Sequence, residues 1–316
     1  MKKLFIAVLA VAGLASCMQD EVLSQDQAAI EFGDAFVDNA TKAIYDDKNY
    51  VKAFKVWGTV TGEDNTTVAL YEGANVKDTA AEGVKNYGAA WTCDVTRFWT
   101  PNCDYAFYAV AHGTVTATNG VPTSIAYEVS EVEPIDLLYG ETTKTTKDDL
   151  AVPEDGALVK FNMQHLLSRV KVSFTNAVKQ EEASPYTYTI SNVEIKTWKQ
   201  GTYTVNAATP WTRLSDGDAT LTFTNPANAV AKGATVSAGG AQLVIPGADV
   251  VVSFDYELNF NGAVIYSDTV SGSVNGLEAG HSYNITATLN LNNEIQFTVD
   301  DETNLGWGTD TTTPIQ

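Results

Sequence analysis

The chain has 316 residues, of which 39 are acidic and 19 are basic, and its formal net charge is -20 at pH 7. A surface this acidic repels nucleic acid and anionic membranes, which excludes a nucleic-acid partner. Hydrophobic residues make up 44% of the chain and charged residues 18%, which excludes an intrinsically disordered protein and allows a sizeable core, with two domains expected at this length.

Residues 1–16 have the pattern of a bacterial lipoprotein signal peptide. Lys2 and Lys3 form a charged start, a short apolar run follows, and the small residues Ala15 and Ser16 precede Cys17. The apolar run is too short for a membrane-spanning helix. The pattern predicts cleavage before Cys17 and attachment of acyl chains, such as palmitate, that anchor the protein to the outer membrane. An ordinary signal peptide with an incidental cysteine is the alternative.

The first predicted strand of the mature chain is followed directly by a polar loop. Ile30, Phe32 and Phe36 fall on alternate positions, and we expect them to share one face of this strand. The loop that follows contains the basic residue Lys42. The first strand is therefore joined to the rest of the chain by a segment that resembles a protease site.

Cys93 and Cys103 are predicted to form a disulfide. An exported protein folds in an oxidising compartment, and Pro101-Asn102 supplies a turn between the two cysteines. Metal binding is the alternative, but His112 does not complete a zinc-binding spacing. We therefore predict no metal and no other cofactor.

The rest of the chain predicts an all-β protein. Its segments are rich in Val, Ile, Tyr, Phe and Thr and are separated by Gly, Asn, Asp or Pro. No long segment has helical spacing, and a short turn around residues 163–170 is the one possible exception. Many short strands at regular spacing favour antiparallel sandwiches. The predicted strands lie at residues 52–60, 67–73, 105–118, 124–132, 169–177, 186–198, 220–225, 241–247, 250–260 and 263–274.

The end of the chain continues this pattern. Residues 282–291 alternate as in a half-buried strand, and the turn at Asn292-Asn293 leads into Ile295, Phe297 and Val299. The polar stretch 140–157 has the composition of a linker. These features divide the chain into a signal peptide (1–16), an N-terminal sandwich domain (17–154) and a C-terminal sandwich domain (155–316).

Residues with catalytic potential are sparse, so we predict that the protein is not an enzyme. His165 lies among apolar residues, as expected of a core or hydrogen-bonded histidine. Residues 215–218 lack the remaining ligands of a calcium loop, and no G-x-S-x-G motif occurs. The strand positions of four tryptophans favour the core over a sugar-binding platform. These are Trp57, Trp91, Trp99 and Trp198.

Several short segments follow one another along nearly the whole chain, in this order: IEFG, ATKA, FKVWG, YAFYAVA, IDLLYG, VKFNMQHLLSRVKV, LVIPG and LEAGHSYNITATLNLNNEIQFTV. In this order and spacing the chain resembles the fimbrillin family, the major and minor subunits of the type V pili of anaerobic Gram-negative bacteria. The resemblance implies two transthyretin-like antiparallel β-sandwich domains in tandem. It also implies export as an outer-membrane lipoprotein and a final place at the cell surface, in the fimbrium.

The resemblance further implies how stalk subunits assemble. An envelope protease cuts after a basic residue behind the first strand, removes the lipid with that strand, and a terminal strand of a neighbouring subunit fills the groove. The matching bond here joins Lys42 to Ala43. Because many members carry arginine at this position and the first arginine of this chain is Arg97, a lysine-tolerant protease and no cleavage at all both stay open.

By the same resemblance the donor strand lies at the carboxyl end. Ile295, Phe297 and Val299, with Leu305 and Trp307 beyond them, are the expected groove fillers. The alternative is that residues 295–299 are the last strand of the second sandwich. In that case the chain is a tip or accessory subunit with a flexible tail.

The predicted function is a fimbrial structural subunit that supports adhesion. Its expected partners are other fimbrial subunits in a homo- or heteropolymer, the outer membrane through the lipid, the envelope protease, and a host or bacterial surface ligand. Two other classes of function compete with it. One is a monomeric surface lipoprotein that binds a glycan or host ligand, and the other is an envelope hydrolase, whose catalytic groups the sequence does not contain.

Overall fold

The computed structural model describes residues 28–37, 51–80, 89–147, 152–178, 185–223, 229–291 and 295–302. Within these ranges the regular structure is strand throughout. The predicted turn at residues 163–170 contains the end of one strand (Leu158–His165) and the start of the next (Ser168–Asn176), joined by Leu166 and Leu167. The prediction of an all-β protein is confirmed, with two parallel strand pairs among the antiparallel ones. The same ranges contain no apolar helix of membrane-spanning length.

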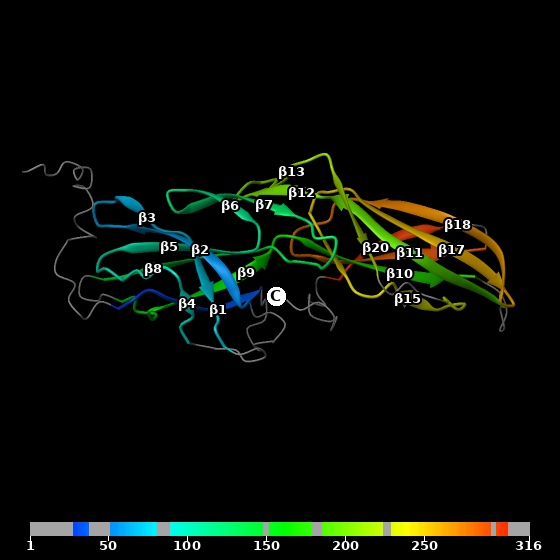
Figure 1. Cartoon of the computed structure of the whole chain (residues 1–316), viewed down its shortest axis with the longest axis horizontal. Coiled ribbons are helices and arrows are strands. Elements are labelled where there is room, and N and C mark those ends of the chain that lie inside the picture. The colour runs from blue at the N-terminus through cyan, green and yellow to red at the C-terminus, as the bar shows by residue number, and fades with distance from the viewer. Residues whose placement is uncertain are drawn as a thin grey trace, which may run out of the picture.

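A seven-stranded sheet and a four-stranded sheet form the N-terminal half of the elongated molecule (Figure 1). The larger sheet has the spatial order β1 (Glu31–Val37), β9 (Leu158–His165), β8 (Leu138–Thr145), β5 (Asp104–Ala111), β2 (Ala53–Thr61), β3 (Thr67–Lys77) and β4 (Thr92–Cys93). The smaller sheet has the order β13 (Trp211–Arg213), β12 (Gln200–Thr204), β7 (Val121–Glu128) and β6 (Thr114–Thr118).

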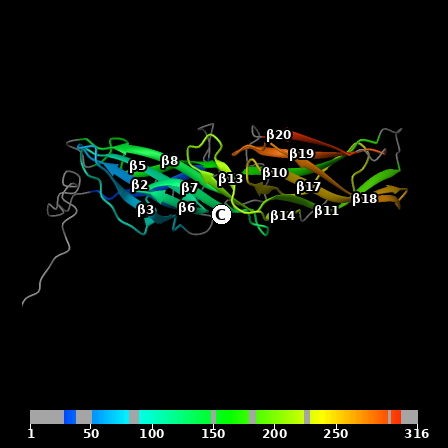
Figure 2. The ribbon, with the colours of Figure 1, turned by 90° about the horizontal axis from the view of Figure 1, so that it is seen from above.

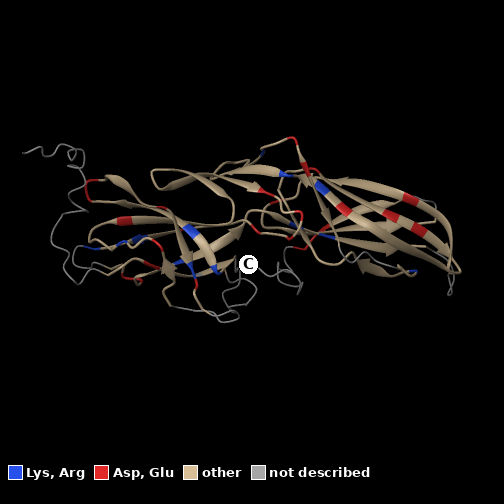
Figure 3. Cartoon of the chain, in the orientation of Figure 1, with Lys and Arg blue, Asp and Glu red and all other residues tan. Residues whose placement is uncertain are grey.

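Two further sheets form the other half, as Figures 1 and 2 both show. One has the order β15 (Thr235–Ser237), β10 (Ser168–Asn176), β19 (Ser282–Leu289) and β20 (Gln296–Asp301), and β16 (Gln242–Val244) also pairs with β10. The other has the order β14 (Asp218–Thr222), β11 (Tyr186–Trp198), β17 (Val250–Phe260) and β18 (Ala263–Val274). Acidic residues are spread over both halves (Figure 3).

Alternation of apolar and polar residues explains why these segments are strands with one buried face. In β9, Val159, Phe161 and Met163 are buried, whereas Lys160 and Asn162 between them are exposed. The buried side chains form two clusters. One lies inside the seven-stranded sheet, and the other runs from the smaller N-terminal sheet through the C-terminal half.

Some of the strands that come after residue 155 in the sequence lie in the sheets of the N-terminal half. β9 follows residue 155 but pairs with β1 and β8, and β12 continues β11 after one residue but pairs with β7. The chain therefore crosses between the halves more than once. The predicted domain boundary between residues 154 and 155 stays a prediction.

The predicted disulfide between Cys93 and Cys103 is absent, because Cys93 has a free thiol. β4, which ends at Cys93, is separated from β5, which follows Cys103, by β3 and β2. Three strand spacings amount to about 14 Å, whereas bridged cysteines have Cα atoms less than about 7 Å apart. The two cysteines also lie toward opposite ends of β2, since Cys93 is level with Phe54 and Cys103 precedes the partner of Thr61.

We predict that Cys93 is alkylated by iodoacetamide in the native, unreduced protein. The reaction is expected to be slow, because burial raises the pKa of this thiol and so lowers its thiolate fraction, and the thiol donates to the Val95 carbonyl at 3.2 Å. Peptide mass spectrometry without reduction checks the label. A peptide in which Cys93 is cross-linked to Cys103 would contradict the strand order.

Candidate functional site

β1 is the strand on which the predicted assembly depends, and most of its apolar side chains are buried. Ile30, Phe32, Ala35 and Val37 are each exposed by less than 5%. The expectation that Phe36 shares the face of Ile30 and Phe32 is wrong. A β-bulge between Gly33 and Ala35 adds a residue and inverts the alternation, so Phe36 is only half-buried at the margin of the cluster.

Both edges of β1 are hydrogen-bonded. One edge pairs with β9 in parallel, from Glu31 opposite Leu158 to Val37 opposite Met163. The other edge donates one backbone hydrogen bond to, and accepts three from, the segment around β4 and residue 51. These bonds are Ile30 N to Arg97 O (2.8 Å), Trp91 N to Phe32 O (2.8 Å), Trp99 N to Ala28 O (3.0 Å) and Val51 N to Ala35 O (3.1 Å). β1 therefore closes the curled seven-stranded sheet by joining β9 to the segment beside β4.

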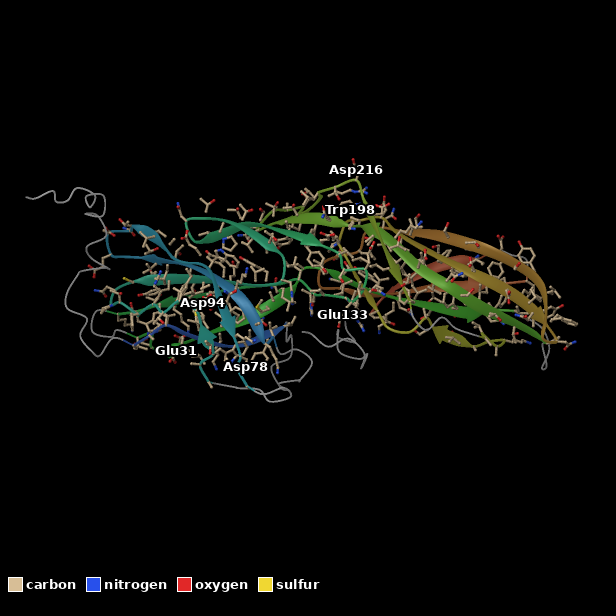
Figure 4. All side chains as sticks on the ribbon, in the orientation of Figure 1. Glu31, Asp78, Asp94, Glu133, Trp198 and Asp216 are labelled. Carbon is tan, nitrogen blue, oxygen red and sulfur yellow. The ribbon has the colours of Figure 1, made fainter. Side chains whose placement is uncertain are left out.

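Phe32 lies at the centre of the cluster inside this closed sheet and is fully buried. Its ring meets Tyr71 and Phe107 edge-on at centroid distances of 5.2 Å and 5.7 Å, and it stacks on Phe161 at 6.3 Å. Burial of such a side chain stabilises the fold by about 1.5–3 kcal/mol, with a further contribution from the aromatic pairs. Glu31, next to Phe32, is exposed on the outer side of the strand (Figure 4).

Gly33 allows a close approach of two backbones. A Cβ atom at this position would lie 2.5 Å from the carbonyl oxygen of Ala89 and 3.3 Å from a methyl group of Leu158. The first contact is with backbone, which a rotamer change cannot move. Gly33 is a functional residue that the sequence reasoning missed, although a glycine inside a strand is itself a signal of close backbone approach.

One buried polar atom of this hydrophobic cluster lacks a hydrogen-bond partner among the described residues. The hydroxyl group of Tyr71 is buried and has no hydrogen-bond partner among the described residues. Burial raises the pKa of Tyr71 well above its usual value, with a smaller contribution from Cys93. The hydroxyl is therefore neutral and can still accept a hydrogen bond.

Of the predicted donor residues, Ile295, Phe297 and Val299 lie in or next to β20, which pairs with β19 of the same chain. Phe297 packs on Gly272 of β18, where an added Cβ would lie 2.4 Å from its ring. Its ring also lies 6.2 Å from that of Phe254. These contacts are those of a strand in the second half's own sandwich. The donor role of these residues stays a prediction.

The remaining predicted assembly residues lie outside the described residues. They are the lipidation residue Cys17, the cleavage pair Lys42 and Ala43, and the donor candidates Leu305 and Trp307.

The other candidate residues have structural roles. His165 is buried and its Nδ1 atom pairs with the Asp136 carboxylate, which confirms a hydrogen-bonded histidine. The turn at residues 215–218 is held by Arg213, which donates to Ser215 O at 2.7 Å and Asp216 O at 2.8 Å. The described residues contain no group of side chains arranged to hold a metal ion.

The tryptophans follow the core prediction with one exception. Trp57, Trp91 and Trp99 are buried, whereas Trp198 is half-buried against the core. The Arg213 guanidinium lies 6.0 Å from the centre of the Trp198 ring, close to the turn that contains Asp216 (Figure 4). Trp198 therefore supports the turn rather than an open sugar platform.

Comparison with known proteins gives one sequence family and several similar folds. A family model described as fimbrillin-like matches residues 41–301. The crystal structure of a fimbrial protein from Bacteroides vulgatus is similar over 86% of this chain and 98% of that chain, with 14% identity and a TM-score of 0.51. A fimbrial assembly protein from Parabacteroides distasonis matches over 87% and 96% of the two chains, with 12% identity and a TM-score of 0.44. No curated protein matches the chain.

We predict that Gly33→Ala lowers the free energy of unfolding by about 1–3 kcal/mol, because the new methyl group pushes β1 away from Ala89. Gly217→Ala is the matched control, since its Cβ has no neighbour closer than 3.9 Å. Urea unfolding of the two variants beside the unaltered protein measures the difference. Equal stability of all three proteins would contradict the close approach.

Proposed function

The chain belongs to the fimbrillin-like family, whose model covers residues 41–301, and on this premise we propose that it is a fimbrial subunit assembled by strand replacement. The family consists of fimbrial structural subunits rather than enzymes. Membership gives the chain a cell-surface location in a fimbrium and other fimbrial subunits as its partners. The route of assembly is the part that we propose.

The closure of the seven-stranded sheet by β1 is the observation that supports strand replacement. This strand lies at the amino-terminal end of the described chain, and the basic residue Lys42 follows it in the sequence. Its removal exposes the edge of β9 and the backbone groups of Trp91 and Val51 that β1 satisfies. An incoming strand pairs with the same groups, as in other cases of β-strand addition.

Side-chain burial gives this exchange its driving force. Ile30, Phe32 and Val37 are almost fully buried, and each contributes about 1.5–3 kcal/mol that is lost when the strand leaves. The unpaired backbone groups add a further cost of about 1–3 kcal/mol each where they stay away from water. A replacement strand with apolar residues at matching positions recovers both terms. The groove that β1 leaves is therefore expected to bind a replacement strand tightly.

Export as a lipoprotein is the first step of the proposed route. Acylation of Cys17 anchors the precursor to the outer membrane, and cleavage between Lys42 and Ala43 by an envelope protease that accepts lysine releases it together with β1. Adhesion to a host or bacterial surface ligand is the proposed role of the assembled fimbrium.

A second candidate function is an uncleaved tip, anchor or accessory subunit, or a monomeric surface lipoprotein that binds a glycan or host ligand. The observation that favours it is that β1 is hydrogen-bonded on both edges and β20 is paired within its own chain. Such a chain needs no strand from a neighbouring subunit to complete the pairing of β1 and β20. Lysine in place of arginine at the cleavage position also favours it.

We predict that mass spectrometry of the protein from surface filaments finds an amino terminus at Ala43. Lys42→Gln is expected to abolish this terminus and filament formation, because the protease then lacks its basic residue. Lys48→Gln, six residues further along the sequence, is the matched control and is expected to leave both unchanged. An acylated Cys17 at the terminus of the surface protein would contradict cleavage and favour the second candidate.

A further inference from the structure

We propose that a carboxylate and three tyrosine rings in the N-terminal half form a binding site for an alkylammonium group, such as the one that ends a lysine side chain. The residues are Glu141, Tyr108, Tyr139 and Tyr203. They lie where the smaller sheet packs on the outer face of the seven-stranded sheet. The site contains no residue of β1 and does not rest on the proposed route of assembly.

Two neighbouring strands of the seven-stranded sheet place Glu141 beside two of these rings. Tyr139 and Glu141 are two residues apart in β8, so their side chains lie on the same face of the sheet. Tyr108 of β5 is directly opposite Glu141 in the antiparallel pairing, and such side chains have Cβ atoms about 4.5–5.5 Å apart. The hydroxyl group of Tyr139 donates to Glu141 Oε2 at 3.1 Å.

The smaller sheet supplies the third ring, that of Tyr203 in β12. Tyr139 belongs to the hydrophobic cluster that contains residues of both sheets, and Tyr108 and Tyr203 pack against this cluster. Trp211 of β13 holds the Tyr203 ring edge-on, with centroids 5.6 Å apart. Burial raises the pKa of all three tyrosines, and the negative charge of Glu141 raises each pKa further. Glu141 is therefore close enough to act electrostatically on all three phenol groups.

The polar groups of this cluster are open to a ligand. Glu141 is exposed, and among the described residues its carboxylate accepts a hydrogen bond from Tyr139 but forms no ion pair. Tyr108 and Tyr203 are half-buried, and their hydroxyl groups have no hydrogen-bond partner in the same part of the chain. The cluster therefore has a carboxylate and aromatic rings in place but lacks a cation.

An ammonium group matches this set of partners. The face of a tyrosine ring attracts a cation that lies within about 6 Å of the ring centroid, and cages of such rings recognise methylated ammonium ligands. The carboxylate accepts a charge-assisted hydrogen bond from an N–H group of the cation. The formal net charge of -20 also raises the concentration of cations near the protein surface.

A sugar fits the cluster less well than an ammonium group does. A sugar ring stacks on a broad, exposed aromatic face, whereas Tyr139 is only 7% exposed and the other two rings are half-buried. A lysine side chain needs only a narrow opening, because it is a slender chain that ends in a compact charge.

Titration of the full chain with Nα-acetyl-lysine amide, followed by saturation-transfer difference NMR, tests the site. Glu141→Gln is expected to raise the Kd about tenfold, because it removes the charge of the acceptor and keeps its shape. Glu257→Gln, at an exposed position of β17 in the other half, makes the same change in net charge and is expected to keep the Kd within about twofold. Equal weakening by the two variants shows binding to the acidic surface in general and overturns the site, as does failure of the probe to bind.

Variants of Tyr203 test the contribution of the aromatic ring. Tyr203→Phe keeps the ring and is expected to leave the Kd within about twofold, whereas Tyr203→Leu removes the ring and is expected to raise the Kd about fivefold. Urea unfolding of both variants checks that they are folded. Equal Kd values for the two folded variants overturn the role of the ring.

Three further probes test the chemistry of the ligand. Nα,Nε-diacetyl-lysine amide has no charge on its side chain and is expected not to bind. Binding of this probe, or of methyl β-galactoside, as tightly as the lysine probe overturns ammonium recognition. n-Butylammonium separates two sources of the ligand. Equal or tighter binding than that of the lysine probe supports a free amine, and weaker binding supports a lysine residue of a protein partner.

Discussion

Closure of the seven-stranded sheet by β1 is the constraint on which the N-terminal half depends. A curled sheet of this kind has two free edges, and here β1 satisfies both, by pairing with β9 and by accepting or donating hydrogen bonds beside β4. Phe32 fills the interior at the same time. One short segment at the amino-terminal end of the described residues provides the pairing and the filling together, and this is why we propose strand replacement for β1.

The C-terminal half contains a similar arrangement that is already complete. There β19 pairs in parallel with β10, as β9 does with β1, and β20 covers the outer edge of β19. Phe297 closes that side by packing on Gly272. In the order of the described chain, the closing strand β20 comes last and the closing strand β1 comes first. Replacement of β1 is the route of assembly that we propose.

Alternation of apolar residues made the strands and the buried face of β9 predictable, as Val159, Phe161 and Met163 show. The same rule failed for Phe36, because a bulge changes the phase of a strand without leaving a clear mark in the sequence. The disulfide prediction for Cys93 and Cys103 failed for a different reason, since a short separation in sequence says nothing about β2 and β3 lying between their strands. Gly33 was visible as a glycine inside a strand, but its neighbour Ala89 lies 56 residues away and only the folded chain identifies it.

Electron cryomicroscopy of the native surface filament would show which chain supplies the strand that closes the seven-stranded sheet. If β1 is replaced during assembly, the strand between β9 and Trp91 belongs to a neighbouring subunit, and residues 31–37 of each subunit are missing from the filament. If that strand is instead the subunit's own segment, with Phe32 between Tyr71 and Phe161, the claim that β1 is replaced during assembly is wrong.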